Sequence, residues 1–292
     1  MRKITIGMVI LSIILIGMVI PAGFSGEVDS VVITYGETTH ANSNYKADVD
    51  AFFKEYTNLD LNKVTEKIIT ASDVNKISST ITGKTYGSDQ VFSSALLDLT
   101  ENDDLEVSVD KSKITTITGD MYISALKSSG IKSGHVYVTS PVEATGESAL
   151  AGIMNSYEEA TDVEIPEPVK EAANKEIYTQ AEIVKTSNVS SDELSDLVND
   201  VKETVKEDNI TDHQTIVVVI NNYTTVNNIN LTQNDVEKLA DSIEQTQNAS
   251  SDAKAYENQV SDVLNSTDIL NGTCSTASSD NSGNGILDKI FN

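Results

Sequence analysis

Arginine, cysteine and tryptophan are nearly missing from this sequence. Among 292 residues the only arginine is Arg2, the only cysteine is Cys274, and there is no tryptophan. A single cysteine excludes an internal disulfide and any zinc or iron–sulfur site built from several thiolates. Without arginine the chain has no guanidinium to bind a phosphate or a base edge in bidentate fashion, which excludes tight phosphate sites of that kind.

Positive charge is scarce as well. The chain has 45 aspartates and glutamates against 20 lysines and arginines, a formal net charge of −25. Proteins bind nucleic acid largely by neutralising phosphates with cations, so we expect no nucleic-acid partner. The acidic residues are spread over both halves and form no tail. This pattern is typical of a surface whose negative charge keeps the protein soluble and makes its copies repel one another. The alternative interpretation is that the acidic residues bind cations.

The first 26 residues differ from the rest. Two basic residues precede an apolar run over 4–20, and small residues follow up to Gly26. This order predicts a secretory signal peptide cleaved after Ser25. The run over 4–24 is also long enough to span a bilayer, so an uncleaved N-terminal membrane anchor is the alternative. In either case we expect residues 27–292 outside the cell or on the outer face of its membrane, with a net charge of −27 once Arg2 and Lys3 are removed.

Residues 27–165 predict an α/β domain, a mixed sheet with flanking helices. We expect strands at 28–35, 64–70, 91–99, 105–109 and 135–139, with the third and fourth joined by a turn at 102–104. Helices are predicted after Ser72 as N-cap, around 121–126 with a stop at Gly130, and at 146–160.

The character changes at Pro166. Residues 166–246 predict a helical region packed on the α/β domain, with helices at 169–184, after Ser190 and after Thr232. The run 216–220 is ambiguous, and its apolar spacing favours helix over strand. We expect residues 247–292 to form a polar, flexible tail, with one amphipathic stretch around Tyr256.

One segment is similar to a known family. It contains Thr118–Leu126, Ser129-Gly130-Ile131, His135–Val142, Thr145–Met154 and Tyr157–Thr161. It resembles the exported proteins catalogued as domain of unknown function 1002 (YpuA-like), and a weaker resemblance covers roughly residues 28–246. The resemblance implies an exported protein of uncharacterised activity, and it implies no catalytic residue.

Motifs that carry chemistry are few. The loop 140–148 leaves a strand and enters a helix, a place that can hold an anion, but Glu143 and Glu147 would occupy it. We expect capping there. None of His40, His135 and His213, nor Cys274, lies in a catalytic motif, so we assign no catalytic residue, no metal ligand and no cofactor.

Two weaker signals lie in the second half. Residues 280–291 partly follow a calcium-binding loop, but Phe291 stands where a bidentate glutamate is needed. Possible glycosylation sequons occur at Asn188, Asn209, Asn222, Asn230, Asn248, Asn265 and Asn271.

The sequence therefore favours a non-catalytic envelope or extracellular binding module with an unknown envelope or extracellular partner. Membrane contact is expected only through residues 4–24, if they are uncleaved. One alternative is an envelope hydrolase that uses carboxylates near the 140–148 loop. The other is a weak calcium-dependent adhesion protein.

Overall fold

A computed structural model describes residues 30–57, 59–81, 83–100 and 104–266. The predicted leader, Cys274, the sequon at Asn271 and the calcium-like loop 280–291 lie outside these residues. In the described part, no helix is both long enough and apolar enough to cross a membrane.

A five-stranded mixed sheet forms the centre of the molecule, with the order β2-β1-β3-β5-β4. The strands are β1 (Val31–Gly36), β2 (Thr65–Ile69), β3 (Ser94–Asp98), β4 (Glu106–Val109) and β5 (His135–Thr139). β1 is parallel to β2 and antiparallel to β3, while β5 is antiparallel to β3 and parallel to β4. The predicted mixed sheet is confirmed.

The prediction that the third and fourth strands pair through the turn at 102–104 is wrong. Both strands form, but β5 lies between β3 and β4. β5 buries Val136 and Val138 on one face and packs Tyr137 on the other, so it takes an interior place, whereas the half-exposed β4 lies at the edge.

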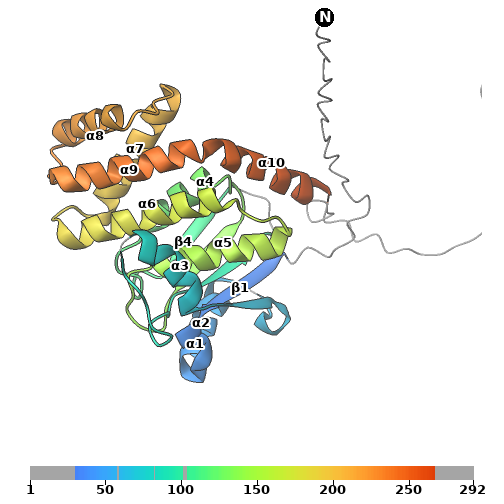
Figure 1. The fold of residues 1–292 in the computed structure, drawn as a ribbon. Coiled ribbons are helices and arrows are strands. Elements are labelled where there is room, and N and C mark those ends of the chain that lie inside the picture. Colours follow the sequence, from blue (N-terminus) through green and yellow to red (C-terminus); the bar gives the residue numbers. More distant parts are fainter. Residues whose placement is uncertain (1–29, 58, 82, 101–103, 267–292) are drawn as a thin grey trace, which may run out of the picture.

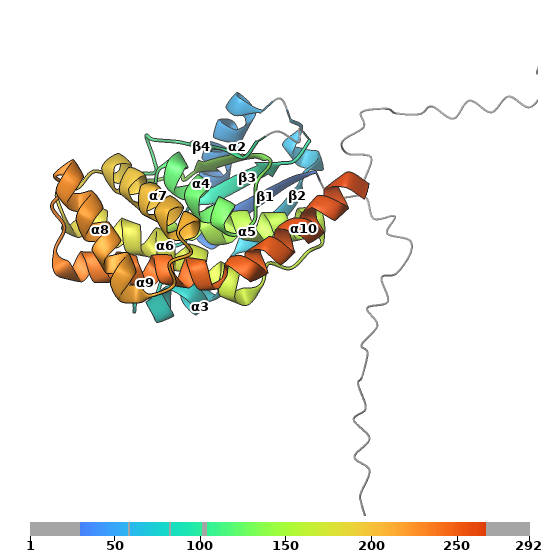
Figure 2. The ribbon, with the colours of Figure 1, turned by 90° about the horizontal axis from the view of Figure 1, so that it is seen from above.

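Helices cover both faces of the sheet (Figures 1 and 2). α1 (Glu37–Ala41) follows β1, and α2 (Ser43–Tyr56) packs Val49 and Phe53 against Ile33 and Leu96 on one face. α4 (Gly119–Ser128) and α5 (Glu147–Thr161) pack on the other face, where Val32 and Leu97 point. The alternation of strand residues between the two faces follows from the period of two in a strand.

The short helix α3 (Ala71–Ile81) begins earlier than predicted. Ser72 is not its N-cap, because the Thr70 hydroxyl accepts the hydrogen bond from the Asp73 backbone N–H. The Asp73 carboxylate in turn accepts from the Thr70 backbone N–H and hydroxyl at 3.1 and 2.7 Å. This reciprocal pair fixes the helix start.

The second half adds a layer of helices over α4 and α5. They are α6 (Glu167–Thr186), α7 (Ser191–Glu207), α8 (His213–Asn227), α9 (Gln233–Asn248) and α10 (Ser250–Ser266). Ser190 and Thr232 cap α7 and α9 as predicted, each in a reciprocal capping box. The run 216–220 is helical, as its spacing favoured.

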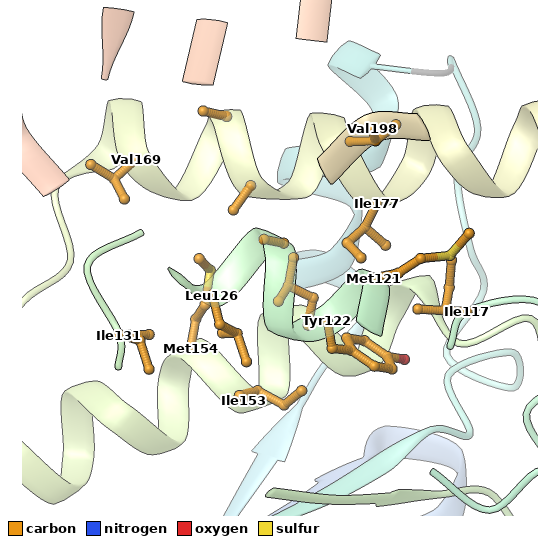
Figure 3. Close-up of a cluster of buried hydrophobic side chains, with 14 of the residues drawn as sticks. Ile117, Met121, Tyr122, Leu126, Ile131, Ile153, Met154, Val169, Ile177 and Val198 are labelled. Atoms are coloured by element: carbon orange, nitrogen blue, oxygen red, sulfur yellow. The ribbon is translucent and has the colours of Figure 1, made fainter. Parts of the chain in front are cut away.

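A continuous hydrophobic core joins the sheet to these helices. It runs from Val32 on β1 through Leu126 and Ile153 to Ile177 on α6 and Leu264 on α10. Figure 3 shows its centre, where α4, α5 and α6 meet and α7 contributes Val198.

The flexible tail was predicted to begin at 247, and this is wrong for residues 250–266. Those residues form α10, which packs beside α5, α6 and α9 (Figure 2). Ala249, Ala253, Tyr256, Val260 and Leu264 are buried at intervals of three and four residues. The surrounding Asn, Ser and Asp residues are mostly its solvent face, which is why composition alone indicated a loose segment.

Candidate ligand-binding cleft

A cavity of about 700 Å³ lies between the ends of α4, α7, α9 and α10. We call it the lysine cleft, because five lysines line it: Lys127, Lys132, Lys202, Lys206 and Lys254. Glu203 and Glu257 are the two acidic residues in the lining. The chain has 19 lysines in total and a net charge of −25, so this concentration of positive charge runs against the composition of the whole protein.

Two helices present lysines to the cleft where they end. Gly130 follows α4 with a φ of 83°, and the Ile131 N–H donates to the Leu126 carbonyl at 3.0 Å. Asn209 follows α7 with a φ of 51°, and the Ile210 N–H donates to the Val205 carbonyl at 2.9 Å. Both are left-handed caps of the Schellman type, which turn the chain sharply after the last helical turn.

The start of α10 closes the cleft from a third side. A Cβ added to Gly130 would lie 2.3 Å from the Ala253 carbonyl oxygen, so the α4 cap and α10 are in direct backbone contact. This close approach requires glycine at 130. It brings Lys254 of α10 and Lys132 together around the Glu257 carboxylate, at 2.8 and 2.7 Å.

The five lysines differ in how they are engaged. Lys202 is held by the buried Glu176, with Nζ–Oε distances of 2.7 and 2.9 Å, and also donates to Ser124. Burial acts to raise the pKa of Glu257, but hydrogen bonds from Lys132 and Lys254 outweigh it and the pKa falls below its ordinary value. The side chains of Lys127 and Lys206 are exposed, and neither has a hydrogen-bond or ion-pair partner among the described residues.

The loop 140–148 is packed rather than open. Thr145 donates to the Glu147 carboxylate, and the Tyr122 hydroxyl donates to the Gly146 carbonyl at 2.6 Å. Ala144 pairs with Ile114 in an isolated bridge, and Glu147 is buried at the start of α5. The cavities of about 380 and 700 Å³ are lined by other segments, and neither Glu143 nor Glu147 lines either of them.

Gly146 permits this packing, and its replacement is testable. Its φ is 107°, and an added Cβ would lie 2.8 Å from Ile114 Cγ2 and from the Tyr122 hydroxyl. Gly146→Ala is expected to lower the free energy of unfolding by about 1–3 kcal/mol. Denaturant titration measures this loss. Gly83→Ala is the matched control, because Gly83 also has a positive φ but no atom within 4 Å of the added Cβ. Equal losses in the two variants would contradict the packing described here.

The three histidines lie on three different elements of the fold. His135 is on β5 with its Nε2 buried and unpartnered within the described residues, and His40 lies in α1 near the Tyr35 ring. His213, at the start of α8, faces three carboxylates from α9, a contact that the sequence analysis missed. The signal was present, since Glu237, Asp241 and Glu244 recur at helical spacing on one face of α9.

Six of the seven sequon asparagines are among the described residues. All six are exposed: Asn188, Asn209, Asn222, Asn230, Asn248 and Asn265. Exposure is what a glycan acceptor requires, and glycosylation stays a prediction.

Comparison with known proteins identifies the family. The family model described as "Protein of unknown function (DUF1002)" matches residues 35–263. The chain belongs to this family. The match includes nearly all of α10, and so extends beyond residue 246, where we expected the resemblance to end.

A relative in the same family is the "Uncharacterized protein YpuA" of Bacillus subtilis (strain 168). It is 26% identical over 265 residues, which cover 90% of this chain and 87% of the relative. Neither the family nor this relative carries a description of an activity. No solved structure matches the chain.

Proposed function

We propose that this chain is an exported, non-catalytic binding module of the cell envelope, and that its lysine cleft holds a compact anionic group with two or more negative charges. The observation that carries the proposal is the gathering of five lysines around one cavity of about 700 Å³ in a protein of net charge −25. That volume falls within the range of about 300–1,000 Å³ typical of small-molecule sites.

The chemistry of the lining defines the class of ligand. Lysine ammonium groups act as point charges on flexible stems and do not impose the planar, bidentate geometry of arginine. A ligand with several separated anionic oxygens therefore suits the cleft better than a single carboxylate. Phosphate groups and clustered carboxylates share this chemistry.

Helix dipoles account for only part of this arrangement. Lys127 and Lys206 lie in the last turns of α4 and α7, where a cation is favourable without any ligand. Lys254 lies in the second turn of α10 and Lys132 lies beyond the end of α4, so a helix terminus favours neither of them. The dipole of each helix thus does not explain why all these side chains gather at one cavity.

Calorimetry on the full chain tests the cleft, with tripolyphosphate as the phosphate probe and citrate as the carboxylate probe. The double variant Lys127→Gln/Lys206→Gln is expected to weaken binding of the preferred probe by at least about tenfold, because each charge-assisted contact contributes about 1.5–3 kcal/mol. Both lysines are exposed, so the variant is expected to remain folded.

Lys111→Gln/Lys185→Gln is the matched control. It removes the same charge from two exposed lysines outside the cleft lining and is expected to leave binding unchanged. Equal weakening in both double variants would show a general charge effect and contradict binding in the lysine cleft. The proposal would also be contradicted if neither tripolyphosphate nor citrate binds.

Export is tested separately, by intact mass of the protein isolated from its natural source. Cleavage after Ser25 gives a secreted chain that begins at Gly26, whereas an anchor leaves the full chain in the membrane fraction. Recovery of the full chain from the cytoplasm alone would overturn this part of the proposal.

A further inference from the structure

His213 and three carboxylates of α9 form a compact group on the surface, which we call the His213 cluster: His213, Glu237, Asp241 and Glu244. The His213 Nδ1 atom lies 3.0 Å from Glu244 Oε2 and 3.5 Å from Asp241 Oδ1. The Nε2 atom on the opposite side of the ring lies 2.9 Å from Glu237 Oε2. The cluster is separate from the lysine cleft, and none of its residues lines that cleft.

We propose that the His213 cluster binds a divalent transition-metal ion such as zinc, with His213 Nδ1, Asp241 and Glu244 as ligands. These three donor atoms all lie within 4.8 Å of one another. Zinc binds nitrogen and oxygen at about 2.0–2.1 Å, so neighbouring corners of its tetrahedron lie about 3.3 Å apart. The two distances from Nδ1, 3.0 and 3.5 Å, bracket that spacing.

Glu237 supplies the outer contact that metal-binding histidines commonly have. When Nε2–H donates to Glu237, the lone pair of Nδ1 is left to point towards Asp241 and Glu244. Glu237 is itself held, because Gln233 Nε2 donates to its other oxygen at 2.9 Å. The contact with Glu237 thus holds the orientation of the ring from the side opposite Nδ1. An acidic patch without a histidine has no such arrangement.

Charge favours a cation at this place. Among the described residues, His213 is the only basic group that contacts Asp241 or Glu244, and Lys238 on the same helix pairs with Glu182 instead. Three carboxylates therefore face one imidazole.

The local backbone explains how the ligands meet. Asp212 caps α8 by accepting from the Thr215 N–H at 2.9 Å, which places His213 as the first helical residue. Glu237, Asp241 and Glu244 lie four and three residues apart, so they share one face of α9. Asp241 also lines a cavity of about 380 Å³ beside α3 and α6, which leaves one side of the metal accessible to water or a further ligand.

Zinc titration of the full chain, followed by calorimetry and by the visible absorption of a cobalt-substituted sample, tests the site. We expect one equivalent of zinc, and we expect His213→Gln and Asp241→Asn/Glu244→Gln each to weaken binding by at least tenfold. Glu237→Gln is expected to weaken it by about 10–100-fold, the usual effect of losing such an outer contact.

Two controls separate the site from general charge. Asp196→Asn/Asp200→Asn removes two exposed carboxylates one helical turn apart on α7, and His40→Gln removes another imidazole. Both are expected to bind zinc like the unaltered chain. Absence of zinc binding, or equal binding by the His213→Gln variant, would overturn the proposal. Calcium binding as tight as zinc binding would overturn the assignment to a transition metal, because imidazole is a poor ligand for calcium.

Discussion

Glu176→Ala is expected to lower the free energy of unfolding by about 3–5 kcal/mol, the cost of leaving a buried charge without its partner. The Glu176 side chain is 2% exposed and that of Lys202 is 14% exposed. Lys202 Nζ contacts both carboxylate oxygens and also donates to the Ser124 hydroxyl at 2.8 Å. These contacts join α4, α6 and α7. The Glu176→Ala variant therefore loses contacts at the boundary between the helical layer and the α/β half.

A double variant separates the charge from the packing. Glu176→Met/Lys202→Met replaces the pair by apolar side chains of similar length and is expected to recover most of the loss, because buried ion pairs contribute little beyond their hydrophobic equivalents. Denaturant unfolding of the single and double variants measures both effects. If the single variant loses less than about 1 kcal/mol, comparable to an exposed pair, Lys202 reaches solvent without its partner and the account of this contact is wrong.

Removing α10 is expected to have the second large effect. A chain that ends at Asn248 loses the burial of Tyr256, Val260 and Leu264, each worth about 1.5–3 kcal/mol. The total loss is therefore at least about 5 kcal/mol. It also exposes the core surface of α5, α6 and α9 that α10 covers (Figure 2).

The matched control is a chain that ends at Ser266 and keeps α10. Its unfolding midpoint is expected to stay close to that of the full chain, while the chain that ends at Asn248 unfolds at much lower denaturant or aggregates. Identical midpoints for the two truncated chains would mean that α10 adds nothing to stability. That is the outcome expected if residues 247–266 belonged to a loose tail.

Periodicity predicted most of the elements because it reflects local geometry. α7 was located by Ser190 and by the spacing of Leu194, Leu197 and Val201, all of which are buried. The pairing of the strands was less accessible. β5 separates β3 from β4 through contacts distant in sequence, and no turn motif signals that order.

The candidate sites were harder to predict than the fold. The lysines of the cleft come from the ends of three helices and one loop, and each is unremarkable in its own segment. Only part of the His213 cluster could be predicted from the sequence, because the spacing of its three carboxylates places them on one helical face. His213 is 24 residues before Glu237, and only the packing of α8 on α9 brings the ring to that face.

The central claim is that the lysine cleft binds a compact anion, and nuclear magnetic resonance of lysine side chains tests it most directly. The full chain labelled at lysine is titrated with tripolyphosphate. Shifts are expected at Lys127 and Lys206, with smaller ones at Lys132 and Lys254, and none at Lys111 and Lys185. Unchanged Lys127 and Lys206 signals at saturating probe, or equal shifts at all six, would contradict the account.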